Sequence, residues 1–249
     1  MEIKPDTTST QENASKRIRN YFTLKNTPKE WITASVVFLL IFTLLTAYLT
    51  VRRGGWISGL FIPNKSLSLT AALFLMYSMV LSPIGQLRNK LPSNIASRRV
   101  YGILGAVAMI IHVIWSLFFI PDRFPLSYYA EPDHIYSIIF GTVGLAIFSM
   151  CLYLSFESKV RKYSSSGIKA IHRTGYIGVA MIIVHMLLLG TGTNVIKWLK
   201  NYVLFYDGTP LEWVAGQSNT WMPGATFYIY LASVVFFAIV FRAFFKRIK

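Results

Sequence analysis

Two histidines occupy corresponding positions in two long apolar segments of the chain. His112 lies in the run 100–120 and His185 in the run 168–189, and neither run has another charged residue near its centre. Imidazoles are rare in the interior of a bilayer, and those found there usually face the helix bundle and serve a pathway or a ligand. Two imidazoles at one depth, on helices that run in the same direction, are suited to axial coordination of a haem iron.

The depth of each histidine follows from the nearest basic residue before it. His112 follows Arg99 by 13 residues, and His185 follows Arg173 by 12 residues. At about 1.5 Å per helical residue, both imidazoles lie roughly 18–20 Å from the basic end, past the middle of an apolar layer about 30 Å thick. We therefore expect His112 and His185 to lie at the same level of the membrane.

A glycine precedes each histidine by seven residues, Gly105 before His112 and Gly178 before His185. Seven residues are about two helical turns, so each glycine shares a face with its histidine about 10 Å nearer the basic end. The missing side chains could make room for a flat macrocycle between the helices, or they could simply allow close helix packing. We expect the macrocycle, because the glycine accompanies both histidines.

The composition predicts an all-α integral membrane protein. The chain has 249 residues, of which 54% are hydrophobic, and its mean hydropathy is +0.48. None of its long apolar runs alternates with period two, as a barrel strand would. We expect a bundle of six transmembrane helices at residues 31–51, 67–87, 100–120, 135–156, 168–189 and 221–241. An outer loop at 52–66 would join the first two helices.

The net charge of +15 predicts orientation in a membrane and not nucleic-acid binding. With the N-terminus in the cytoplasm, 19 of the 25 lysines and arginines fall on the inner side. This bias places both termini in the cytoplasm and leaves Arg52 and Arg53 as the one inconsistency outside. We expect a polar cytoplasmic tail at residues 1–30 and a six-helix domain at 31–249, with 67–189 as its core.

Several kinds of redox machinery are excluded. The single cysteine, Cys151, cannot form a dithiol relay, an iron–sulfur site or a multi-cysteine zinc site. The chain has no glycine-rich fingerprint for a dinucleotide and no phosphate loop. Reducing equivalents would have to come from a separate protein, a bound flavin or a membrane quinol.

The motifs around the two histidines resemble the ferric-reductase-like transmembrane family. Residues 97–105, which lead to His112, are similar to that family's Arg-Arg…Leu-Gly…His helix. Residues 171–176, which lead to His185, are similar to its His-Arg/Asn…Tyr…His helix. The resemblance covers roughly residues 67–189. In size the chain is most similar to the MsrQ-like subfamily, the haem-binding membrane subunits of bacterial periplasmic methionine sulfoxide reductases.

The resemblance implies a protein of the bacterial inner membrane that binds haem b. Electrons would pass from a cytoplasmic flavin reductase or a membrane quinol to an acceptor on the outer face. The acceptor would be a periplasmic methionine sulfoxide reductase, or ferric iron or dioxygen as in related members. His112 and His185 would be the axial ligands of an outer haem.

The resemblance also implies a site near the basic end. His172 would be the candidate ligand of a second, inner haem, while Arg98 and Arg99 would either act as orientation signals or pair with haem propionates or an FMN phosphate. The chain departs from the two-haem members here, because Arg99 stands where they have a histidine. The 13-residue spacing from His172 to His185 also turns a straight helix by about 220°, so the two histidines would not share a face.

Two other classes of function remain open from the sequence. A proton-coupled transporter could use His112 and His185 as titrating groups without haem, although no intramembrane acidic residue or lysine would complete the relay. A membrane anchor could recruit a partner through the long loop at 190–220, where residues 194–205 have the pattern of a surface helix.

Overall fold

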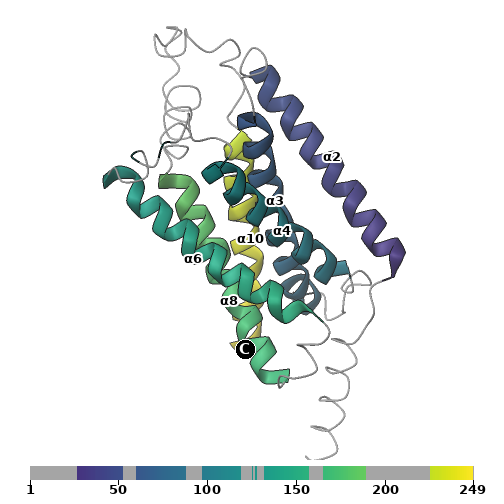
Figure 1. Cartoon of the computed structure of the whole chain (residues 1–249). Helices are drawn as coiled ribbons and strands as arrows, with labels where there is room; N and C mark the ends of the chain where they lie inside the picture. The colour runs from purple at the N-terminus through teal and green to yellow at the C-terminus, as the bar shows by residue number, and fades with distance from the viewer. Residues whose placement is uncertain are drawn as a thin grey trace, which may run out of the picture.

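The computed structural model describes residues 27–52, 60–87, 97–118, 132–156, 165–188 and 225–248, together with residues 125 and 127. These residues form six α-helices and contain no strand. Each of the six apolar runs corresponds to one helix (Figure 1), so the all-α fold class is confirmed. The helices are α2 (Pro28–Arg52), α3 (Phe61–Leu87), α4 (Ser97–Phe118), α6 (Pro132–Ser155), α8 (Ser165–Met186) and α10 (Ala225–Ile248).

The surface of the bundle is suited to a membrane. Among the described residues, α2, α3, α4 and α6 are long and apolar enough to cross a bilayer. Ile32 of α2 and Val234 of α10 are each 65% exposed, and many other large apolar side chains are also exposed. In water such a surface would drive aggregation, whereas lipid tails cover it without cost. The chain is therefore a membrane protein, while six spans with both termini in the cytoplasm stay a prediction.

A capping box sets the start of α2. The Glu30 backbone N–H donates to Thr27 Oγ1 at 3.3 Å, and the Thr27 N–H donates to Glu30 Oε2 at 2.8 Å. Pro28 occupies the first helical position, where its missing N–H is not needed. The helix thus begins three residues before the first apolar run of the sequence.

The start of α3 differs from the sequence prediction. The helix begins at Phe61 and not at residue 67, so residues 61–66 are helical and not part of a loop. Pro63 is tolerated because it lies in the first turn, where backbone N–H groups have no partner within the helix. The Asn64 N–H donates to the Leu60 carbonyl at 2.8 Å and closes the first turn. Asn64 is consequently placed on a helix, inside the bundle.

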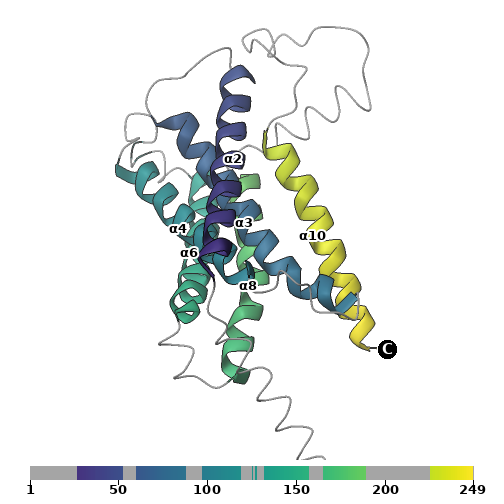
Figure 2. The ribbon, with the colours of Figure 1, turned by 90° about the vertical axis from the view of Figure 1, so that its right-hand side faces the viewer.

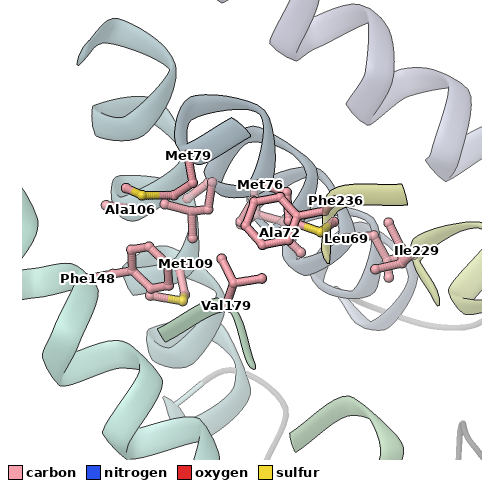
Figure 3. Close-up of a cluster of buried hydrophobic side chains, with 14 of the residues drawn as sticks. Leu69, Ala72, Met76, Met79, Ala106, Met109, Phe148, Val179, Ile229 and Phe236 are labelled. Carbon is pink, nitrogen blue, oxygen red and sulfur yellow. The ribbon is translucent and has the colours of Figure 1, made fainter. Parts of the chain in front are cut away.

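The central helix of the bundle is α3. Two-thirds of its apolar window (67%) is buried, compared with 11% for α2, which lies on the outside of the bundle (Figure 1). α3 contacts α2, α4, α8 and α10, whereas α6 packs mainly on α8 and to a smaller extent on α4. Side chains from five helices meet around α3 and form the apolar core shown in Figure 3. Its labelled members include Met76, Met109, Phe148, Val179 and Phe236.

Hydrogen bonds between helices fix their directions. Ser78 Oγ, late in α3, donates to the carbonyl of Arg98 at the start of α4, so these two helices are antiparallel. The Tyr176 hydroxyl, in the middle of α8, donates to the carbonyl of Met79, while Met186 at the end of α8 lines a small cavity with Ala72, two turns earlier in α3, so α8 is also antiparallel to α3. Figure 2 shows α10 beside α3, and near its end Lys246 Nζ donates to the Leu87 carbonyl at the end of α3. α4 and α8 therefore run in the same direction.

Most of the hydroxyl groups within the bundle donate to carbonyls of their own helices. Thr70 Oγ1 donates to the Ser66 carbonyl, and Ser233 Oγ donates to the Ile229 carbonyl, both one turn earlier. This arrangement is needed because no water is available in an apolar bundle to satisfy a polar group. A side chain that instead forms a hydrogen bond to another helix therefore fixes how the two helices lie against each other.

Several predicted features lie outside the described residues. These are most of the tail at 1–30, the loop that contains Arg53, and the surface helix at 194–205 with the rest of the loop at 190–220. The predictions made for them are not tested by the structure.

The close packing of α4 against α3 at Gly105 yields a first prediction. A Cβ atom at Gly105 would lie 3.1 Å from the backbone nitrogen of Leu75 and 3.1 Å from Cβ of Phe74. Because a backbone atom cannot move aside, Gly105→Val should separate the helices and lower the free energy of unfolding by about 1–3 kcal/mol. Unfolding in detergent by denaturant measures this. Val107→Leu, at a site 40% exposed on the same helix, is the matched control. An equal free energy of unfolding for Gly105→Val and Val107→Leu would contradict the close packing of α4 on α3 at Gly105.

Candidate functional site

His112 is held by a chain of three hydrogen bonds between α3 and α4. Its Nδ1 atom lies 3.0 Å from Asn64 Oδ1. Asn64 Nδ2 donates to Ser116 Oγ at 2.9 Å, and Ser116 Oγ donates to the backbone carbonyl of His112 at 2.9 Å. The hydroxyl hydrogen of Ser116 is used in this last bond, so Ser116 Oγ can only accept from the NH2 group of Asn64. The Asn64 amide must therefore turn its Oδ1 toward His112. An amide oxygen only accepts, so His112 Nδ1 carries the hydrogen.

His185 is held in the same tautomer by α6. Its Nδ1 atom lies 2.7 Å from the backbone carbonyl of Ser137, which can only accept. Ser137 Oγ donates to the backbone carbonyl of His185 at 3.1 Å and lies 3.0 Å from its Nδ1. His185 Nδ1 is therefore also the N–H of its ring.

The second nitrogen of each ring is a potential ligand atom. A second proton on either ring would place a charge inside an apolar bundle, which is unfavourable without a counter-ion. The two imidazoles also lie within electrostatic range of each other, so two charged rings would repel. His112 and His185 are consequently two neutral imidazoles, each with a lone pair on Nε2.

The two histidines lie at one end of the bundle. His112 bonds to Asn64 in the first turns of α3, and His185 bonds to Ser137 near the start of α6. Cys151 Sγ, near the other end of α6, contacts the Ile171 carbonyl early in α8, so α6 is antiparallel to α8 and parallel to α3. His112 and His185 therefore lie toward the same end of the bundle, and their equal depth in a membrane stays a prediction.

The three glycines near the histidines face different neighbours. A Cβ atom at Gly105 would meet Leu75 and Phe74 of α3, and one at Gly178 would meet Phe148 and Ile147 of α6. Both glycines therefore allow close helix packing, which was one of the two roles expected for them. The other role, space for a macrocycle beside them, stays a prediction. Gly141 is the glycine that touches a histidine, because its Cβ would lie 2.7 Å from His185 Nδ1.

The remaining predicted site residues lie toward the opposite end. Arg98 is within electrostatic range of both His172 and Cys151, and its Nη2 lies 3.9 Å from Met79 Sδ. Arg99 is the next residue of α4 and is partly buried. Arg98 and His172 therefore lie in the same part of the bundle, near enough for their charges to interact and away from His112 and His185.

Four residues of the site were missed in the sequence: Asn64, Ser116, Ser137 and Gly141. Asn64 lay in a segment assigned to a loop, which hid its place inside the bundle. Ser116 follows His112 by one helical turn, a spacing that could have identified it. The partner of His185 is a backbone carbonyl, which no side-chain pattern reveals.

No group of three or more His, Cys, Asp or Glu side chains placed to hold a metal ion occurs within the described ranges. Haem needs fewer protein ligands, because the porphyrin supplies four nitrogens and the protein only the axial ones. In the comparisons with known proteins, no family model matches the chain and no curated protein matches it. Any assignment of function therefore rests on the residues themselves.

The contact between Gly141 and His185 yields a second prediction. Gly141→Ala should displace the imidazole and weaken its bond to the Ser137 carbonyl, since no Cβ is tolerated 2.7 Å from Nδ1. The measurement is the nitrogen NMR spectrum of protein labelled with 15N-histidine, in which the His185 signals should shift. Gly144→Ala is the control, because its Cβ would first meet the movable Cγ1 of Ile182 at 3.1 Å. Unchanged His185 signals in Gly141→Ala would show that the ring does not rest on this glycine.

Proposed function

We propose that the protein is a membrane electron carrier that binds haem b between His112 and His185. The observation that carries this proposal is that Nδ1 of each ring faces a protein oxygen that can only accept, from which the same tautomer follows for both rings. Both imidazoles donate Nδ1–H to a protein oxygen and keep the Nε2 lone pair. Histidines that ligate a metal almost always donate their other ring N–H in this way, because the bond fixes the ring and raises its basicity.

The surroundings of the pair fit such a group. The imidazoles come from two parallel helices, lie toward the same end of the bundle and are close enough for their charges to interact. The helices that carry them are otherwise apolar around both residues, which excludes water and favours a neutral ring. When bound, haem would supply a one-electron couple. The chain itself would hold two neutral ligands in fixed orientations through Asn64, Ser116 and Ser137.

The direction of electron flow that we propose is from the cytoplasm outward across a bacterial inner membrane. It is supported by the bias of lysines and arginines, which favours a cytoplasmic basic end. A cytoplasmic flavin reductase or a membrane quinol would be the donor. The acceptor would be a periplasmic methionine sulfoxide reductase, as the similarity of the histidine motifs to MsrQ implies. A ferric or oxygen reductase of the same family would use the same haem and differ only in the acceptor.

The cluster at the basic end supports a second role for the same chain. The charge of Arg98 acts on His172 there, within a bundle that is otherwise mostly apolar. A guanidinium in such a place favours an anionic group, which in this proposal is a haem propionate or the phosphate of FMN. Arg99 and His172 would complete this site, and His172 would be the ligand of an inner haem if two haems bind.

Replacement of the two ligands tests the proposal. Reduced purified protein should have a b-type optical spectrum with at least one haem per chain. His112→Ala and His185→Ala should each abolish it, because one axial ligand is lost. His112→Met should retain haem and raise its reduction potential, since a methionine ligand favours ferrous iron. Val107→Leu, on the surface of the same helix, is the control for correct folding.

A folded, colourless protein from haem-replete cells would contradict the proposal. If that protein also catalysed a pH-dependent flux that depends on both histidines, the proton-coupled transporter would replace it. The haem-to-protein ratio of His172→Ala, compared with the unmodified protein, measures whether the basic end holds a second haem.

A further inference from the structure

The two imidazoles are held by acceptors of different kinds. His185 donates to the backbone carbonyl of Ser137, which is present whatever side chain residue 137 carries. His112 donates to the side-chain amide of Asn64, which only this residue provides. The His185 ring is therefore fixed by the backbone of α6. The His112 ring is fixed by a single side chain of α3.

Asn64 has little freedom to do anything else. Its side chain is buried, with 4% of the residue exposed. The Ser116 hydroxyl uses its hydrogen on the His112 carbonyl, so it can only accept from the Asn64 amide. A flipped amide would place its oxygen against a hydroxyl whose hydrogen is already used, so that two acceptors would face each other. Ser116 therefore imposes the orientation of Asn64, and Asn64 imposes the tautomer of His112.

We propose that Asn64 is the positioning residue that selects the Nδ1–H tautomer of His112 and sets the strength of Nε2 as a ligand. Its effect on a reduction potential rests on the proposed function, but its effect on the tautomer does not. Donation from Nδ1–H shifts electron density toward Nε2, so the hydrogen bond strengthens binding to ferric iron more than to ferrous iron. Asn64 thereby adjusts one axial ligand while the other stays constant.

The first test uses the haem-free protein labelled with 15N-histidine. In the unmodified chain and in Asn64→Asp, the His112 signals should report a hydrogen on Nδ1, because both residues offer an acceptor. In Asn64→Leu, a hydrogen on Nε2 should become the main form. The control is Ser66→Ala, which removes a fully buried hydroxyl from the same helix that bonds only to the Ile62 carbonyl. A hydrogen that stays on Nδ1 in Asn64→Leu would overturn the proposal.

The second test measures haem affinity and midpoint potential in the same variants. Asn64→Leu should bind haem about 10–100-fold more weakly, as expected when the partner of a ligand is lost. Its potential should rise, and a tenfold loss of preference for ferric iron corresponds to about 59 mV for a one-electron couple. Asn64→Asp should lower the potential, because a carboxylate accepts more strongly than an amide and is favoured in the first turns of a helix.

A third variant keeps the proposal testable if Asn64→Leu does not fold. Ser116→Ala leaves Asn64 in place but releases its amide, so the potential should change in the same direction as in Asn64→Leu and by less. Equal potentials in Asn64→Asp, Ser116→Ala and Ser66→Ala would contradict the proposed control by Asn64.

The two proposals fail in different ways. If the unmodified protein binds no haem, the proposed function is wrong, and the tautomer of His112 in the haem-free variants still decides the role of Asn64. If haem binds and neither tautomer nor potential responds to residue 64, the proposed function stands and the positioning role is wrong.

Discussion

A polar side chain inside an apolar helix bundle must find its hydrogen-bond partner within the protein, and the arrangement of this bundle follows that constraint. Most of the hydroxyl groups meet it locally, as Thr70 and Ser233 do through carbonyls of their own helices. An imidazole in mid-helix meets it through a neighbouring helix. His112 and His185 therefore tie α4 to α3 and α6 to α8 while each ring keeps one nitrogen lone pair.

The same bonds connect packing to chemistry. A partner on Nδ1 leaves Nε2 as the ring nitrogen able to bind a metal, so the contacts that satisfy the two histidines would also prepare them for the ligand role that we propose. Gly141 adds a steric constraint, because the His185 ring occupies the space where a side chain would be. The central position of α3 is consistent with this view, since that helix supplies Asn64 to the pair and Met79 to the Arg98 cluster.

The sequence predicted where the helices lie along the chain, but it did not predict which residues join one helix to another. Apolar runs identify each helix because a helix packed in an apolar bundle requires such a run, and most of their limits lie within three residues of those observed. The start of α3 was missed because Pro63 suggests a turn, although proline is also accepted in a first helical turn. The shared end of the bundle at which His112 and His185 lie could be predicted by counting along the chain, since helical rise is constant. Their partners could not, because neither the rotation of a helix nor the place of a backbone carbonyl is encoded in residue spacing.

The central claim is that His112 and His185 present their Nε2 atoms to one iron. The low-temperature electron paramagnetic resonance spectrum of the oxidised, purified protein tests it most directly. Two imidazole ligands should give the signal of low-spin ferric haem. A high-spin ferric signal, or the absence of any haem signal from folded protein, would contradict the account.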